Sequence, residues 1–366
     1  MSLDAILVAI QTALPVHVVG GPGIGKTSFM QLLAKTVGRH LETFIASTHE
    51  PSDVNGLPVT REDRVGVSFE PADFVYRILD NEKKGVGSIL FMDEISTAPP
   101  AMQAGCLRLV HEKIVGNVPL PRDMWIGMAS NPTDTSSGTF LLSAAMANRM
   151  LHFEWKVNSI EWIEGMVTGF KLERRLKILA DGWRDAISSQ RGIVASYVQH
   201  RQAALYQLPK NAEDQGVAWP SPRTWDMCAT LLAAGGSVQL EQDDMNFLMA
   251  SAVGEKAALE FLEWQRNLDL PNPEALLASK GKIKIPERSD QIFAMLTSVA
   301  NAAVSRMTKP RWERAWEIMG QAAAEKKGDL AAIPAKLLAS GRKTGYDIPE
   351  SVMKFSKILG AAGLLK

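Results

Sequence analysis

The feature that most constrains this fold is a glycine-rich run made of Gly20, Gly21, Pro22, Gly23, Ile24, Gly25, Lys26, Thr27 and Ser28. Its first eight residues fit G-x-x-x-x-G-K-[ST], and they lie between a predicted strand at 15–21 and a predicted helix at 28–38. In such a loop, backbone N–H groups and the helix start hold a phosphate. Lys26 then reaches the β- and γ-phosphates, and Thr27 offers a hydroxyl to Mg²⁺. The alternative is a glycine-rich turn with a chance Lys-Thr pair.

A second motif ends an apolar run at 88–94, SILFMDE, with two carboxylates. The apolar residues predict a central strand. Asp93 at its end could hold Mg²⁺ through its water shell, and Glu94 could orient and deprotonate an attacking water. A strand that merely ends in acidic residues is the alternative, and a phosphate loop upstream in the same sheet argues against it. The pair favours ATP hydrolysis over nucleotide transfer.

A third polar residue follows the strand predicted at 124–132, where the chain reads MWIGMASNP. Asn131 would lie at the end of that strand, next to the end of the strand with the two carboxylates. Its amide could contact a γ-phosphate or the attacking water. The alternative is that Asn131 and Pro132 form an ordinary turn.

The chain organisation changes near residue 155. Before it, short apolar runs alternate with helical patterns, which predicts an α/β fold with a parallel five-stranded sheet covered on both faces. After it, apolar residues recur at helical spacing throughout. The 366 residues are enough for two or three domains. We expect a nucleotide-binding domain at 1–155, a helical lid at 156–235 and a helical C-terminal extension at 236–366.

Composition excludes several classes of protein. The 40 basic and 40 acidic residues give zero net charge, which argues against a protein held mainly by nucleic-acid phosphates. No apolar run is long enough for a membrane span, and the N-terminus lacks the basic segment of a secretory signal. The two cysteines, Cys106 and Cys228, make neither a disulfide framework nor a zinc site. A cytoplasmic location is the expectation.

These motifs resemble a known family. GGPGIGKTS, ILFMDEIS, ASNP and LSAAMANRM occur in the order seen in AAA+ ATPases, and the finer pattern is similar to the MoxR branch, in the clade with an insert in helix 2. Residues 47–78 look like that branch's loop, β-hairpin insert and following helix. The resemblance covers about residues 1–230. It implies a P-loop NTPase core of AAA+ type, with ATP and Mg²⁺ bound between the core and the lid.

The resemblance also assigns two arginines. Arg149, in MANRM, matches the arginine finger that reaches a neighbouring subunit's γ-phosphate, where a cation stabilises the transition state. Arg223, in WPSPRTW, matches the sensor-2 arginine, and Pro222 suits a first helical turn. The resemblance leaves open whether Arg223 acts on its own subunit's nucleotide or on a neighbour's. A sheet-end arginine, and a helix-start arginine packed on Trp219 or Trp225, are the alternatives.

A finger that acts on a neighbour implies a homo-oligomer, and the family implies a hexameric ring that remodels a protein client. The resemblance extends faintly to bacterial proteins that accompany von Willebrand A-type partners. Two other functions stay open: a nucleic-acid motor, disfavoured by the neutral charge, and a scaffold whose assembly ATP controls, disfavoured by an intact Glu94 and Arg149.

Some features depart from the family or fall outside it. The segment 111–124 is too short for a long projecting pore hairpin, and the last 135 or so residues match nothing residue by residue. We interpret His49, His152 and His200 as isolated core or surface histidines, and the basic stretch at 280–288 as a solvated loop.

Overall fold

The computed structural model describes residues 3–60, 65–132, 138–172, 176–347, 349–361 and 363–364. The chain forms two compact units, one made of residues 1–181 and 206–258 and the other of residues 182–205 and 259–366. The division into three domains at residues 155 and 235 stays a prediction. Among the described residues, no helix combines the length and the apolar character needed to cross a bilayer.

The first unit is built on a parallel five-stranded sheet. Its strands are β1 (Val16–Val19), β2 (His40–Ile45), β5 (Ser88–Asp93), β8 (Trp125–Ser130) and β9 (Leu151–Glu154), in the order β2-β5-β8-β1-β9. All pairings in this sheet are parallel. The fold class predicted from the sequence, a five-stranded α/β core followed by a helical region, is confirmed.

The central strands are apolar because both faces of the sheet are covered. Every residue of β8 is buried, and so is every residue of β5 before Asp93. Along β5, Leu90 and Met92 pack into one large core with side chains of α4, α5 and α6, whereas Phe91 faces α1 and α2. The strand alternation therefore places these two helix groups on opposite faces.

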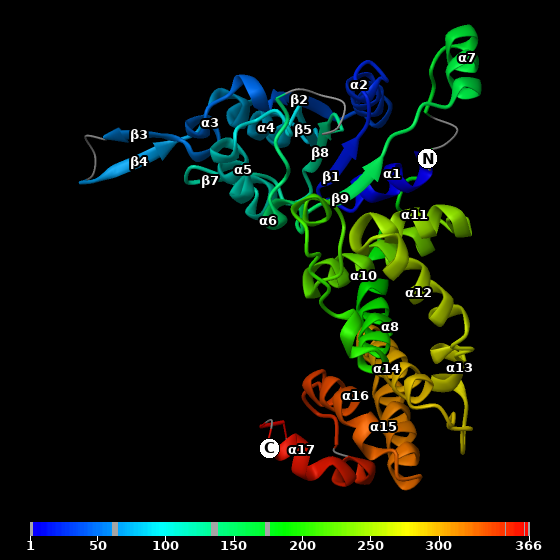
Figure 1. Cartoon of the computed structure of the whole chain (residues 1–366). Coiled ribbons are helices and arrows are strands. Elements are labelled where there is room, and N and C mark those ends of the chain that lie inside the picture. The colour runs from blue at the N-terminus through cyan, green and yellow to red at the C-terminus, as the bar shows by residue number, and fades with distance from the viewer. Residues whose placement is uncertain are drawn as a thin grey trace. The chain divides into compact units, whose positions relative to one another are not determined.

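The helices of this unit are α1 (Leu3–Gln11), α2 (Lys26–Val37), α3 (Pro51–Asn55), α4 (Asp73–Lys83), α5 (Pro100–Glu112), α6 (Ala144–Ala147), α7 (Ser159–Thr168), α9 (Ala212–Gln215), α10 (Pro222–Ser237) and α11 (Gln242–Val253), with a short 3₁₀ turn at η1 (Ala46–Thr48). Figure 1 shows the strands of the sheet with α1, α2, α4, α5 and α6 beside them. Helices α10 and α11 pack on each other, and both contact α1.

Two hairpins lie outside the main sheet. Strands β3 (Leu57–Thr60) and β4 (Val67–Glu70) form the hairpin expected in the 47–78 segment, and it extends away from the sheet in Figure 1. Strands β6 (Ile114–Val115) and β7 (Val118–Pro119) form a much smaller one with two residues on each side. This second hairpin occupies the segment that the sequence indicated is too short for a long projection.

The second unit is helical over its described residues. It contains α8 (Ile187–His200), α13 (Pro273–Ala278), α14 (Ser289–Ser305), α15 (Lys309–Ala324), α16 (Gly328–Ser340) and α17 (Ser356–Ala361), with 3₁₀ turns η2 (Trp183–Ala186), η3 (Gln202–Ala204) and η4 (Glu350–Phe355). Helix α12 (Glu255–Arg266) begins in the first unit and ends in the second. Helix α14 packs against α8, α15 and α16. Buried Trp312 and Trp316 are the largest side chains of this core, so these tryptophans are structural.

Candidate active site

The phosphate loop runs from the end of β1 to the start of α2, as the sequence predicts. Gly25 precedes the helix with a φ of 97°, in the left-handed region that favours glycine. Gly20 is required for a different reason, since a Cβ there would lie 2.5 Å from the Ile24 side chain and 2.9 Å from the Trp155 carbonyl oxygen. The loop is therefore held tightly against the chain that leaves β9.

Lys26 lies at the centre of the site. Its Nζ donates hydrogen bonds to the carbonyl oxygens of Gly20 at 2.6 Å and Gly21 at 2.9 Å, and to Oδ1 of Asn131 at 2.9 Å. Burial lowers the pKa of Lys26, while the nearby charges of Asp93 and Glu94 oppose that shift. The loop lysine and the amide at the end of β8 thus meet, because β1 and β8 are neighbours in the sheet.

Thr27 and Asp93 form the second contact across the site. The Thr27 hydroxyl donates to Oδ2 of Asp93 at 2.7 Å, and the Glu94 backbone N–H donates to Oδ1 of the same carboxylate at 2.9 Å. Both carboxylate oxygens of Asp93 are therefore oriented. Hydroxyl and carboxylate oxygens side by side are hard donors, which fit Mg²⁺ together with water and phosphate oxygens.

Glu94 has an unusual backbone conformation. Its φ is 56°, which a residue with a side chain rarely adopts, and such conformations cluster at functional sites. Its carbonyl oxygen accepts from the Thr97 backbone N–H at 3.0 Å and from the Thr97 hydroxyl at 2.8 Å. The exposed Glu94 carboxylate accepts a hydrogen bond from the Ser47 hydroxyl at 3.0 Å. The turn after β5 thus presents this carboxylate to solvent at the end of the strand.

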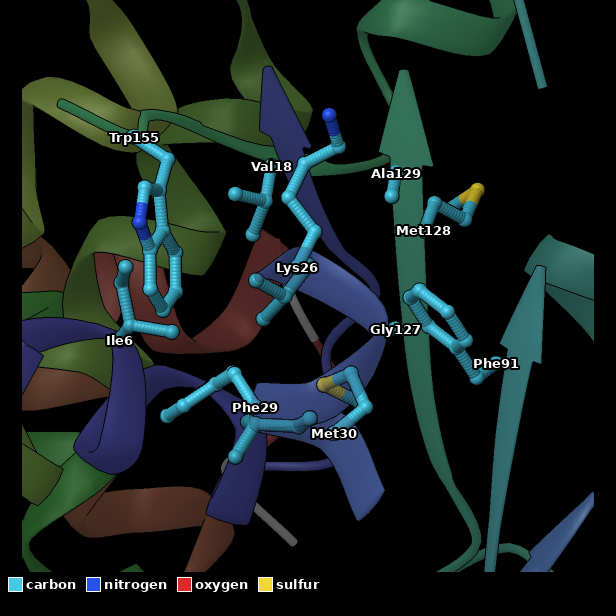
Figure 2. Close-up of a pocket in the computed structure, with 12 residues that line it drawn as sticks. Ile6, Val18, Lys26, Phe29, Met30, Phe91, Gly127, Met128, Ala129 and Trp155 are labelled. Atoms are coloured by element: carbon cyan, nitrogen blue, oxygen red, sulfur yellow. The ribbon is translucent and has the colours of Figure 1, made fainter. Parts of the chain in front are cut away.

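The cavity drawn in Figure 2 lies next to the phosphate loop and is not a nucleotide site. Apolar side chains of α1, α2 and the sheet line it, among them Phe29, Met30 and Phe91. It has room for about one water molecule. The Lys26 stem runs beside Val18, and its ammonium group points away from this apolar cluster (Figure 2). The cavity is a packing gap between α2 and the sheet.

The two arginines lie at the opposite edge of the sheet, where the parallel strands begin, whereas the phosphate loop lies where they end. Arg149 precedes Leu151, the first residue of β9, which pairs with Val16 at the start of β1. The phosphate loop follows the opposite end of β1. Arg149 donates from Nη1 to the Ala145 carbonyl oxygen at 2.6 Å. The sequence motifs therefore divide into two groups, one at each edge.

Arg223 belongs with Arg149. Helix α10 begins with Ser221 as its N-terminal cap, and the Ser221 hydroxyl donates to Oδ1 of Asn148, the residue before Arg149, at 2.9 Å. Burial lowers the pKa of Arg223, and the charge of Arg149 lowers it further. At the end of α5, burial lowers the pKa of His111, followed by the charges of Arg149 and then Arg223. These three side chains form a basic cluster.

Ser47 is a residue that sequence reasoning missed. It lies in η1, directly after β2, the strand that pairs with β5. Only its position after a strand next to β5 could have suggested the contact with Glu94.

One comparison with known proteins covers the part of the chain that holds these residues. Residues 16–152 match the model of the ATPase family associated with various cellular activities (AAA). The chain is an ATPase. No curated protein matches the sequence. Among solved structures, a crystal structure named as that of a candidate ATPase from Cytophaga hutchinsonii ATCC 33406 is 18% identical and covers 77% of this chain and 89% of its own, with a TM-score of 0.44.

Proposed function

We propose that this ATPase works as a ring of MoxR type, in which each nucleotide is bound by one subunit and completed by arginines of the next. The observation that carries the proposal is the separation of Arg149 from the phosphate loop of its own chain. Strands β1 and β9 pair over four residues, which at about 3.3 Å per step puts about 10 Å between their first and last paired positions. Arg149 lies before one end, and the loop begins after the other.

An arginine side chain is shorter than this separation, so Arg149 can act only on a nucleotide held by another subunit. Arg223 follows the same logic, because Ser221 ties the start of α10 to Asn148 at that edge. We therefore assign Arg223 to the neighbour's nucleotide as well. A finger on one edge and a loop on the other make a head-to-tail interface, which closes into a ring when the rotation between subunits allows it. The family resemblance favours six subunits.

Within one subunit, each residue at the loop edge has a separate role in ATP hydrolysis. Backbone N–H groups of Gly20–Thr27 and the start of α2 bind the phosphates, and Lys26 moves from its carbonyl partners to the β- and γ-phosphates. Thr27 and Asp93 would hold Mg²⁺, which when bound would neutralise phosphate charge. Glu94, oriented by Ser47, accepts a proton from the attacking water. Asn131 contacts the γ-phosphate or that water.

The work done with ATP is, in this proposal, the remodelling of a partner protein. The β3–β4 hairpin supports it, since Leu57, Val59, Val67 and Phe69 are all exposed there. Exposed apolar residues gathered on one projecting element are typical of protein-binding surfaces. The resemblance to the MoxR branch favours a von Willebrand A-type client, and the neutral net charge disfavours a nucleic-acid track.

Subunit mixing tests the shared site. Arg149→Ala removes the finger and should lower turnover by about 10³-fold or more. Glu94→Gln removes the base of its own site but keeps the finger. When the two variants are mixed, an Arg149→Ala subunit beside a Glu94→Gln subunit forms one complete site. At equal amounts, about one site in four should then be active in a ring with random order.

Phosphate release across a series of mixing ratios is the measurement, with Glu94→Gln mixed with Glu325→Gln as the matched control. Glu325 is exposed in the second unit, so that mixture should show only dilution of the active protein. Activity of the first mixture that stays at the sum of its separate components at every ratio contradicts the ring.

A further inference from the structure

A line of hydrogen bonds crosses the sheet from the edge with the phosphate loop to the edge with the arginines. Ser130 Oγ lies 2.8 Å from Nε2 of His17, Nδ1 of His17 lies 3.3 Å from Nδ1 of His152, and Nε2 of His152 lies 2.9 Å from the Ala147 carbonyl oxygen. The two histidines occupy paired positions in β1 and β9. They join β8 to the end of α6 through two other strands.

The proton positions follow from the acceptor at one end. A carbonyl oxygen only accepts, so Nε2 of His152 carries a proton. In a neutral ring Nδ1 of His152 then carries no proton and must accept a hydrogen bond from Nδ1–H of His17. Because Nδ1 of His17 carries the proton of that ring, Nε2 of His17 is unprotonated and accepts from the Ser130 hydroxyl. Every bond therefore has one donor and one acceptor, provided that both rings are neutral.

The surroundings keep both rings neutral near pH 7. Burial lowers the pKa of His152 to about 4, against a weaker opposing effect of its hydrogen bond to Ala147. Burial also lowers the pKa of His17 well below its usual value, followed by the charges of His152 and Lys26. His17 is 2% exposed. Such a pair is a fixed structural link.

Each end of the line leads to a residue of the proposed mechanism. Ser130 precedes Asn131, and its carbonyl oxygen accepts from the Gly20 backbone N–H at 3.1 Å. Ala147 precedes Asn148 and Arg149, and Asn148 accepts from Ser221, the cap of the helix that carries Arg223. One end therefore contacts the phosphate loop, and the other lies in the segment that leads to Arg149 and is bonded to the start of the helix that carries Arg223.

We propose that His17 and His152 are positioning residues, which hold the Arg149 segment in register with the Asn131 strand so that each subunit presents its arginines correctly to the neighbouring site. This inference rests on the proposed shared site. It adds two residues that act through Arg149 without touching nucleotide. Apolar side chains would fill the same strand positions without needing hydrogen-bond partners, so packing alone does not account for two paired histidines.

Two variants break this line of hydrogen bonds at different places. His17→Gln keeps an oxygen that can accept from Ser130 but loses the donor to His152. His152→Asn keeps an oxygen that can accept from His17 but is too short to reach Ala147. Because a misplacement of about 1 Å can cost about 10²-fold, we expect each variant to lower kcat by about ten- to a hundredfold with nucleotide Kd unchanged.

The double variant sharpens the test. Both substitutions interrupt the same line of hydrogen bonds, so the second should cause no further loss once the first has been made. The double variant should therefore turn over no more slowly than the slower single variant. Two unrelated packing defects would instead lower kcat by the product of their separate effects. His200→Asn is the matched control, since His200 is exposed on α8, and it should leave kcat unchanged. His17 is the more deeply buried of the two histidines, so His152→Asn serves by itself if His17→Gln does not fold.

Mixing then locates the defect. A subunit with a misplaced finger still has a complete loop edge, so His152→Asn should regain activity when mixed with Glu94→Gln and not when mixed with Arg149→Ala. The opposite pattern, or an unchanged kcat in a folded variant, overturns the positioning role. The Arg149→Ala and Glu94→Gln mixture is the reference. If it fails to complement, the shared site falls and this inference falls with it. If it complements while His152→Asn shows the opposite pattern, only this inference falls.

Discussion

The two edges of the sheet differ in how their charged groups are arranged. At the loop edge, the Asp93 carboxylate is held by Thr27, Glu94 is held by Ser47, and Lys26 has three oxygen partners. At the other edge, Arg149 and Arg223 lie close enough that one charge lowers the pKa of the other. At the loop edge each charged group is held by neutral hydrogen-bond partners and charges of both signs lie near one another, whereas the other edge brings two positive charges together.

This difference suggests which groups act within one subunit and which act on the nucleotide of a neighbour. Gathering like charges is unfavourable within one chain, and an anion brought by a neighbour relieves the repulsion. A nucleotide γ-phosphate is such an anion. In the proposed ring, the loop edge binds the nucleotide of its own subunit, and the arginine edge acts on the nucleotide of the next subunit.

Removing the base from the loop edge should lower turnover more than removing Arg223 from the other edge. Glu94→Gln keeps a group that can accept from Ser47 but cannot take a proton, so turnover should fall by about 10²–10⁴-fold. Nucleotide binding should persist, because Lys26, Thr27 and Asp93 are untouched. Phosphate release and the Kd of a fluorescent ATP analogue measure the two quantities. Turnover within tenfold of the unaltered protein would remove Glu94 from the base role.

The assignment of Arg223 to the arginine edge can be tested by choice of mixing partner. Arg223→Ala should lower turnover by about 10²-fold, in the range for loss of one group that stabilises transition-state charge. If Arg223 acts on the neighbour, mixing with Glu94→Gln restores activity and mixing with Arg149→Ala does not, because both arginines must come from one subunit. If it acts on its own nucleotide, the two results exchange, and Arg223 belongs to the loop edge.

The smallest effect concerns the link between the edges and its dependence on pH. The folded protein keeps the pKa of His152 at about 4, below the 6.5 of an ordinary histidine. Between these values the unfolded chain binds a proton that the folded chain does not, so stability falls as pH falls from about 6.5 to about 4. His152→Asn lacks this contribution. The Tm difference between the unaltered protein and His152→Asn should therefore shrink as pH is lowered from 7 to about 4.5. A difference independent of pH would mean that His152 is not held neutral.

The sheet could be predicted because strands buried on both faces are continuous apolar runs. Such a run can be recognised in the sequence without knowing which strand it pairs with. The meeting of Lys26, Asp93 and Asn131 was also predictable, since parallel strands bring their carboxyl ends to one edge. Each of these residues directly follows a recognisable strand or belongs to a recognisable loop.

The rest depends on contacts that one sequence does not reveal. The pairing of His17 with His152 depends on the register between strands that are 135 residues apart. The sequence alone therefore predicts His152 as a core or surface histidine and does not reveal its partner His17. The contact of Ser47 with Glu94 depends on a 3₁₀ turn, and the position of Arg223 depends on the Ser221–Asn148 hydrogen bond. Short polar contacts between distant segments leave no periodic pattern.

The close approach of Gly20 to Trp155 gives the protein an internal optical reporter. The Trp155 indole packs against Phe29, with ring centroids 4.9 Å apart, and its backbone N–H donates to the Val19 carbonyl oxygen at 2.7 Å. A nucleotide that shifts the loop changes the environment of this indole and hence its emission. The difference in fluorescence between the unaltered protein and Trp155→Phe then follows ATP binding in real time, without any attached dye.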